Sequence, residues 1–196
     1  MNPNHSFQEG DLLFEFDPLH WQVRKYDQHS YFQGFSGVGL KGVDFVANFE
    51  GRELWLIEVK NYSVQRSIRQ KEVDVVLRDP SKIVEALEQK FADTLAGIRA
   101  IYTYYQRKER KRWNWLNAWR RPDPEEIFWQ EACQIGVETQ QIRLVLWIAS
   151  DQDYAVPIQK IIQGIQNHPN LQDYSVVVFE QDNSPQPPFL KVKFQP

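Results

Sequence analysis

Three charged residues have the types and spacing of a metal-assisted active site. Asp44 is followed, after a gap of 13 residues, by Glu58, and Lys60 comes two positions later. Two carboxylates can hold a divalent cation, and a cationic side chain beside them suits a phosphodiester under attack. The trio therefore predicts metal-dependent phosphodiester chemistry.

The trio lies on two expected β-strands joined by a tight turn. A three-residue loop over 50–52 would pair Phe49 with Glu53. The same register places Asp44 directly opposite Glu58. The loop glycine is the middle residue, whereas such loops usually have glycine at the last position. A slip of one residue would move Asp44 away from the face that carries Glu58.

Strand geometry then brings the functional groups together. Directly opposed residues of an antiparallel pair have Cβ atoms about 4.5 to 5.5 Å apart. Two carboxylates about 5 Å apart repel by roughly 3 kcal/mol at an effective dielectric of about 20. A divalent cation between Asp44 and Glu58 is the simplest way to relieve that repulsion. Lys60 has the same parity as Glu58, so it projects to the same face.

The second strand, residues 54–60, is apolar on both faces until its last positions. The face that carries Glu58 and Lys60 also carries Leu54 and Leu56, and the opposite face carries Trp55, Ile57 and Val59. This pattern is typical of an interior strand that is covered on both faces. Open α/β sheets often place ligands at the carboxyl ends of such strands. The alternative is an exposed hairpin whose end merely carries charges.

These residues resemble the PD-(D/E)xK nuclease superfamily. The match consists of Asp44, the 13-residue gap and Glu58-Val59-Lys60, followed by a long helix and a further strand, helix and strand. It covers roughly residues 7 to 105 and 141 to 180. Val43 stands where the family name has proline, at a position that the family keeps loosely. The resemblance implies an α/β fold of the restriction-endonuclease-like type, with a mixed central sheet flanked by helices.

The resemblance also implies roles for individual residues. Asp44 and Glu58 would ligate Mg²⁺ or Mn²⁺, and the backbone carbonyl of Val59 would be a further ligand. Lys60 would position or activate the attacking water. The implied activity is that of a hydrolase, a Mg²⁺- or Mn²⁺-dependent endo- or exodeoxyribonuclease.

Two further inferences stay open at this point. Many members of the superfamily add a glutamate from an N-terminal element, for which Glu9 and Glu15 are both candidates. The alternative function is a catalytically inactive nuclease-fold module that binds nucleic acid or another protein. Metal-dependent cleavage would distinguish the enzyme from the module.

The distribution of charge bears on a nucleic-acid partner. The chain has a formal net charge of −3 and a pI of about 5.8, unlike a typical DNA-binding protein. Residues 107–121, however, carry seven basic side chains and one acidic, a local charge of +6 interleaved with tryptophans. This segment would contact phosphates and stack on bases, or else form a solvated helix end whose tryptophans pack on the core or on another subunit. The candidate contacts to DNA are Lys41, Arg107, Lys108, Arg110, Lys111, Arg112, Trp113 and Trp115.

Length and composition indicate one domain over residues 1–196. Within it we expect a helical insertion, rich in Trp and Arg, over 107–138, and a C-terminal extension over 181–196. The single Cys133 excludes an internal disulfide. The polar start lacks the apolar region of a signal peptide, and no run is long enough to cross a membrane. A cytoplasmic protein is expected.

Helices and strands are also expected along the rest of the chain. Asp79-Pro80 and Asp123-Pro124 each have the form of a helix start. The first helix has an apolar stripe with a period near 3.6. Gln89, Lys90 and Asp93 lie off the centre of this stripe and either reach toward the site from one turn of the helix or, the favoured alternative, are ordinary surface positions. Short strands, or a strand and a helical turn, are expected at 10–16 and 21–26, and a glycine-rich turn is expected at 34–42. Helices are expected from 123 to about 134 and at 157–166. Further strands are expected at 142–149, 174–179 and 190–194.

Overall fold

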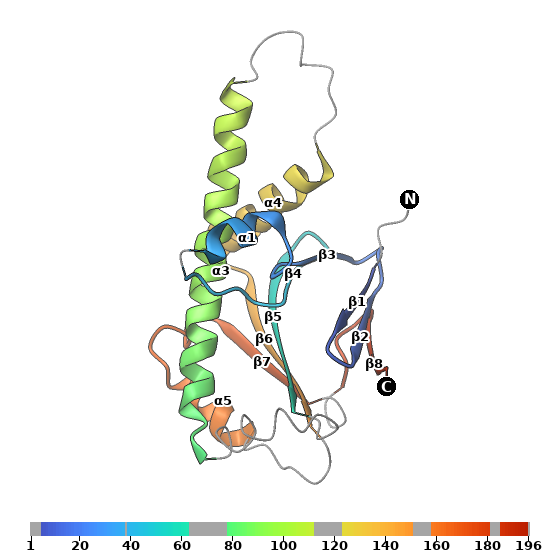
Figure 1. Cartoon of the computed structure of the whole chain (residues 1–196), viewed down its shortest axis with the longest axis vertical. Helices are drawn as coiled ribbons and strands as arrows, with labels where there is room; N and C mark the ends of the chain where they lie inside the picture. Colours follow the sequence, from blue (N-terminus) through green and yellow to red (C-terminus); the bar gives the residue numbers. More distant parts are fainter. Residues whose placement is uncertain are drawn as a thin grey trace.

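The computed structural model describes residues 5–37, 39–62, 78–111, 123–150, 158–180 and 185–195. Two sheets and a layer of helices pack against one another (Figure 1). Within the described residues no helix has the length and apolar character needed to cross a membrane. The elements, in chain order, are β1 (Ser6–Glu9), β2 (Leu12–Phe16), β3 (Trp21–Lys25), α1 (Ser30–Ser36), β4 (Phe45–Phe49), β5 (Glu53–Tyr62), α3 (Ser81–Lys111), α4 (Pro124–Gln134), the π-helix η2 (Ile135–Thr139), β6 (Ile142–Ser150), α5 (Ile158–Gln166), β7 (Ser175–Glu180) and β8 (Leu190–Phe194).

The central sheet is mixed and has five strands in the order β3-β4-β5-β6-β7. Strands β3, β4 and β5 are antiparallel neighbours, whereas β5, β6 and β7 run parallel. Strand β5 is therefore an interior strand, and its side chains are buried on both faces, as its apolar pattern predicts. The expectation of a mixed α/β fold with helices beside the central sheet is confirmed.

The hairpin between β4 and β5 has the predicted register. Phe49 pairs with Glu53. The turn is closed by a hydrogen bond from the Arg52 N–H to the Phe49 carbonyl at 3.0 Å. Glu50 and Gly51 have φ angles of 52° and 66°, in the left-handed region that glycine adopts readily. Glycine is favoured in the middle of this loop because both central residues need positive φ.

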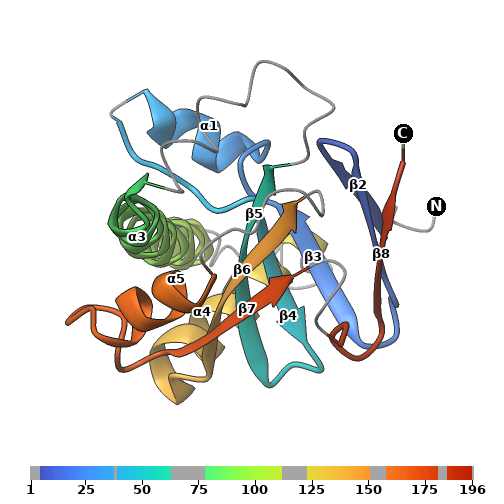
Figure 2. The same ribbon diagram turned by 90° about the horizontal axis from the view of Figure 1, so that it is seen from below.

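Different layers cover the two faces of the central sheet (Figure 2). On one face, Leu54 and Leu56 pack in a cluster with residues of α3, α4 and α5. On the other face, Trp55 and Ile57 pack against an antiparallel sheet of order β1-β2-β8. Strand β8 pairs with β2 along its whole length, so it joins segments from opposite ends of the sequence. The sequence predicts β8 as a strand but not its partner.

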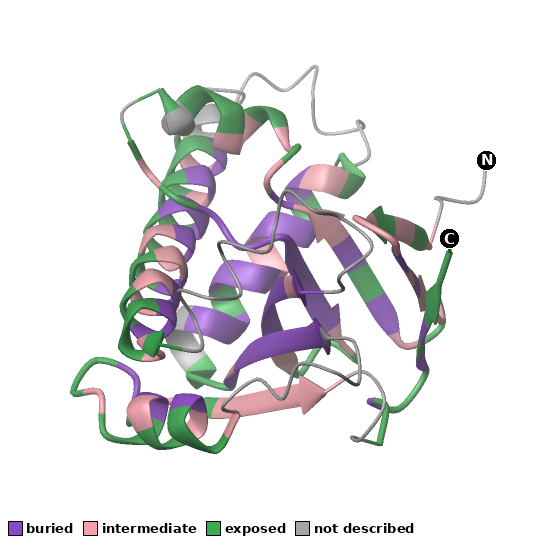
Figure 3. Ribbon diagram, turned by 60° about the horizontal axis from the view of Figure 1, so that its bottom comes forward, coloured by how far each residue is buried: buried purple, intermediate pink, exposed green. Residues whose placement is uncertain are grey.

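Helix α3 is 31 residues long and starts where the Asp-Pro pair predicts, with the Asp79 carboxylate accepting the Ser81 N–H at 3.2 Å. Figure 3 shows the buried side of the helix against the sheet. The predicted stripe is buried except for Leu95, which is partly buried; it comprises Ile83, Leu87, Phe91, Leu95, Ile98, Ile101 and Tyr105. The period of the sequence therefore predicts correctly which side of the helix packs inward.

The segments around α3 show two further features. Helix α1 occupies Ser30–Ser36, where the glycine-rich segment was expected to begin as a turn, and its Phe32 ring packs against Tyr26 at 5.1 Å. Helix α4 lies within the proposed insertion 107–138 and buries Phe128 and Trp129 completely in the core. Residues 64–77, where the sequence is compatible with an irregular extension or with a strand at 73–77, lie outside the described residues.

The N-cap of α4 gives a testable prediction about stability. Asp123 has extended backbone geometry, and its Oδ1 accepts the Glu125 N–H at 3.1 Å. We expect Asp123→Ala to lower the free energy of unfolding by about 1 kcal/mol, because a helix N–H loses its acceptor. Urea denaturation measures the change, with Asp173→Ala in the exposed loop before β7 as control. Equal effects of the two substitutions would contradict a capping role.

A candidate acidic site at the end of strand β5

The predicted trio meets at one cavity of about 250 Å³ near the carboxyl end of β5. The residues that line it come from the end of β1 and the turn after it, from the position just before β4, from β5 and from α3. They are Glu9, Gly10, Asp44, Glu58, Val59, Lys60, Asn61, Tyr62 and Lys90. Asp44, Glu58, Lys60 and Val59 are thus brought together as the sequence predicts.

Asp44 lies immediately before β4, and the β4–β5 register aligns it with Glu58. It is only 9% exposed, and its Oδ2 accepts the Val59 N–H at 2.6 Å. Burial, and then the negative charge of Glu58, raise the pKa of Asp44 from 3.8 to about 7, although Lys90 and the Val59 N–H act in the opposite direction. The carboxyl group therefore keeps a proton close to neutral pH unless a positive charge arrives nearby.

Glu58 is 1% exposed and carries a buried charge that two lysines compensate. Its Oε1 lies 2.8 Å from the Lys60 Nζ and 2.7 Å from the Lys90 Nζ. Its Oε2 accepts from the Lys90 Nζ, also at 2.7 Å. A buried carboxylate is costly without such partners, so these contacts explain how Glu58 is tolerated in the core.

Lys90 also stands at the site, although the sequence analysis favours a surface position for it. Its side chain is 23% exposed and reaches from α3 to the end of β5. Lys90 directly precedes Phe91 of the buried stripe, and its ammonium group contacts Glu58 at the cavity. Its place at the edge of the stripe is a weak indication in the sequence, but its partner Glu58 is 32 positions away.

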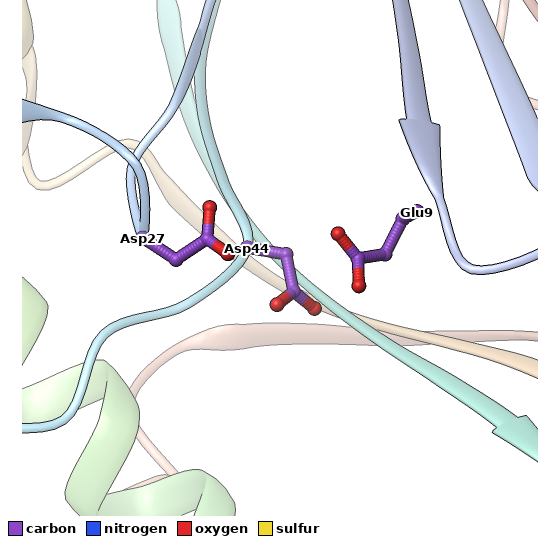
Figure 4. A group of neighbouring side chains, drawn as sticks. All are labelled: Glu9, Asp27 and Asp44. Atoms are coloured by element: carbon purple, nitrogen blue, oxygen red, sulfur yellow. The ribbon is translucent and has the colours of Figure 1, made fainter.

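Two further carboxylates lie beside Asp44, with Asp27 on one side of it and Glu9 on the other (Figure 4). One carboxylate oxygen from each of Glu9, Asp27 and Asp44 lies within 4.8 Å of the other two. Asp27 follows β3, and the preceding Tyr26 donates its N–H to the Asp44 carbonyl at 2.8 Å. Burial raises the pKa of Asp27, and its Oδ1 is buried without a hydrogen-bond partner among the described residues. The sequence analysis did not identify Asp27, because only the pairing of β3 with β4 brings it to Asp44.

The donor atoms around Asp44 suit a hard divalent cation. The cluster offers carboxylate oxygens only, the ligands that Mg²⁺, Mn²⁺ and Ca²⁺ prefer. Asp27 Oδ1 has no hydrogen-bond partner among the described residues. A cation would offset the burial and the negative charge of Glu58 that raise the pKa of Asp44. Glu9 also contacts the Lys25 Nζ at 2.8 Å, so it is partly compensated already. The residues therefore fit the expected cofactor.

The two N-terminal glutamates are placed differently. Glu9 lines the cavity, whereas Glu15 lies in β2 and contacts the Lys193 Nζ of β8 at 2.6 Å. Of the two candidates, only Glu9 stands at the site. Glu15 instead forms an ion pair with Lys193 within the small sheet and is not among the residues that line the cavity.

The two candidate nucleic-acid contacts whose side chains the structure describes, Lys41 and Arg107, do not line the cavity. Lys41 is exposed and is absent from the cavity lining; its backbone N–H donates to Asp93 of α3 at 2.9 Å. Arg107 is exposed on α3. The remaining candidates fall outside the side chains or residues that the structure describes; they are Lys108, Arg110, Lys111, Arg112, Trp113 and Trp115.

Comparisons with known proteins provide no relative from which a function might be transferred. No family model matches the chain, and no curated protein or solved structure matches it. The chemistry of the cavity is therefore the basis for any functional inference.

Proposed function

We propose that this protein is a metal-dependent nuclease of the PD-(D/E)xK type, with a restriction-endonuclease-like fold, that hydrolyses phosphodiester bonds in DNA with Mg²⁺ or Mn²⁺. The observation that supports it most is the meeting of Asp44, Glu58 and Lys60 in one cavity at the end of an interior strand. Two buried carboxylates with neighbouring ammonium groups are the side chains that such a reaction needs.

In the proposed site, Asp44 holds the cation together with Glu9 and Asp27, and the Val59 carbonyl and Glu58 are further candidate ligands. The bound cation would neutralise charge on the phosphate and lower the pKa of a water molecule. The Val59 N–H fixes one oxygen of Asp44, which orients the other toward the neighbouring carboxylates. Lys60 donates hydrogen bonds to the attacking water or to a phosphate oxygen.

The cavity lining carries two lysines against three carboxylates, so a bound cation together with the two ammonium groups would supply the positive charge that an anionic substrate needs. The ammonium groups of Lys60 and Lys90 both line the cavity, and their side chains are 31% and 23% exposed. Both are therefore open in part to a ligand. A phosphate group that enters would meet positive charge from β5 and from α3.

The test is loss of activity in two single variants. Asp44→Ala and Lys60→Ala are each expected to lower Mn²⁺-dependent cleavage of DNA by about 100-fold or more, because each removes a group that acts on the reacting atoms. Cleavage is measured on single-stranded, duplex and branched DNA, and Mn²⁺ binding by calorimetry. Asp173→Ala and Lys82→Ala, both exposed and outside the cavity, are the matched controls. Wild-type protein that neither binds Mn²⁺ nor cleaves any of these substrates would sink the proposal.

One observation favours the second candidate function, a nuclease-fold module without catalysis. Glu58 already has two ammonium partners within 2.8 Å, so its charge is compensated without a cation. Such a module would bind nucleic acid or another copy of the chain through residues 107–121. Gel shifts with and without chelator separate the two functions. DNA binding that is independent of metal, is lost on Arg107→Ala with Lys108→Ala, and is accompanied by no cleavage would favour the module.

A further inference from the structure

We propose that Lys90 is a positioning residue that holds Glu58 and compensates its charge, so that Lys60 can leave Glu58 for a phosphate oxygen of the ligand. This inference rests on the proposed function, because the phosphate belongs to its substrate. It assigns different tasks to two lysines that contact the same carboxylate.

The turn of α3 that carries Lys90 is fixed to the chain segment that leads into Asp44. Thr94 is fully buried, and its Oγ1 accepts the Val43 N–H at 3.1 Å and donates to the Lys90 carbonyl at 2.7 Å. One residue earlier, the Asp93 carboxylate accepts the Lys41 N–H at 2.9 Å. The backbone of Lys90 is thus held by contacts that do not involve Glu58, so its ammonium group is delivered to Glu58 by a rigid support.

The two lysines hold Glu58 unequally. Lys90 bonds both carboxylate oxygens at 2.7 Å, whereas Lys60 bonds only Oε1 at 2.8 Å. If Lys60 moves away, both oxygens keep Lys90 as a partner. If Lys90 is removed, Oε2 loses this ammonium in a side chain that is only 1% exposed. Removal of the partner of a buried carboxylate strongly destabilises a protein. Lys90 therefore provides most of the compensation for the charge of Glu58.

This inequality permits an exchange of partners at the cavity. Lys60 is the more exposed of the two lysines, at 31% against 23%, and it lies at the open end of β5. An arriving phosphate competes with Glu58 for its ammonium group. Because Lys90 still compensates Glu58, the exchange does not leave a bare charge in the core. Lys60 is then available to the substrate at no large cost to the fold.

The first experiment compares thermal unfolding of the metal-free proteins in chelator. Lys90→Met is expected to lower the Tm by about 5 °C or more, and Lys60→Met by less than about 2 °C. In a Glu58→Gln background the effect of Lys90→Met should largely vanish. Lys90→Arg keeps the charge and should restore most of the Tm, and Lys82→Met on the same helix is the control. If Lys90→Met alone does not fold, the Glu58→Gln, Lys90→Met protein should.

The assignment is overturned if Lys60→Met lowers the Tm as much as Lys90→Met, or if the effect of Lys90→Met persists in the Glu58→Gln background. This measurement needs neither metal nor cleavage. A failure of the nuclease proposal, seen as wild-type protein without Mn²⁺ binding or cleavage, is therefore distinguishable from a failure of the Lys90 assignment.

The second experiment measures binding of inorganic phosphate by calorimetry. Lys60→Met should weaken binding about tenfold or more, whereas Lys90→Arg should change it less than about threefold, since it keeps Glu58 compensated and Lys60 in place. Wild-type protein that binds no phosphate, or a loss in Lys90→Arg as large as in Lys60→Met, would overturn the exchange.

Discussion

Asp44→Asn is expected to stabilise the metal-free protein at pH 8 by about 2 to 4 kcal/mol while it abolishes metal-dependent cleavage. The pKa of Asp44 is raised from 3.8 to about 7, chiefly by burial. Between these values the folded protein binds a proton that the unfolded chain has lost, so stability falls as the pH rises from about 4 to about 7. Asparagine does not ionise, and its side-chain oxygen can still accept the Val59 N–H.

Urea denaturation in chelator at pH 4, 6 and 8 measures this effect. The difference between Asp44→Asn and wild type should be small at pH 4, grow through pH 6 and level off above pH 7. Added Mn²⁺ should stabilise the wild type and not the variant. The cation compensates the negative charge of the Asp44 carboxylate, and asparagine has no such charge. Asp173→Asn, in an exposed loop, should show no such pH dependence. A stability difference that is constant with pH would mean that Asp44 ionises normally in the folded protein.

Gly97→Ala is expected to lower the free energy of unfolding by about 3 kcal/mol. This loss is expected although the helix propensity of alanine is more favourable than that of glycine by up to about 1 kcal/mol. A Cβ atom at Gly97 of α3 would overlap the hydroxyl oxygen of Tyr26. The Tyr26 ring is 1% exposed and lies 5.1 Å from the Phe32 ring and 5.9 Å from the Trp129 ring, so it has little room to move. Overlap in a close-packed core must therefore be relieved by displacing α3 or the chain around Tyr26.

A double-variant comparison identifies the cause. Tyr26→Phe removes the overlapping oxygen, so it should recover part of the stability lost in Gly97→Ala, as measured by urea denaturation. Ala96→Gly is the matched control, since Ala96 is exposed on the same helix and should lose only about 1 kcal/mol. If Gly97→Ala instead stabilises the protein, the approach of Tyr26 to α3 is looser than the structure indicates.

The features that the sequence predicts correctly depend on near neighbours in the chain. Alternation along residues 54–60 predicts which side chains of β5 share a face, and the loop length predicts the register that aligns Asp44 with Glu58. The position of Gly51 in the loop does not weaken that register, because Glu50 and Gly51 both have positive φ angles and Phe49 still pairs with Glu53.

The features that the sequence does not predict depend on contacts between distant segments. Lys90 meets Glu58 only because α3 crosses the end of β5, and no local period shows which turn of the helix will do so. Asp27 reaches Asp44 through the pairing of β3 with β4. The choice between Glu9 and Glu15 likewise depends on which end of the small sheet faces the central one. Tertiary packing, not propensity, fixes these positions.

The pairing of β8 with β2 also has a consequence for biosynthesis. Glu9 belongs to β1, which pairs with β2, and the other neighbour of β2 is β8. On the ribosome, β1 and β2 emerge before the other strands of these two sheets, but β2 lacks this partner until residues 190–194 have been translated. Until then Phe14 and Leu12 have only part of the layer that buries them. The three-stranded sheet that carries Glu9 is therefore completed only after the segments that carry Asp44 and Glu58 have been translated.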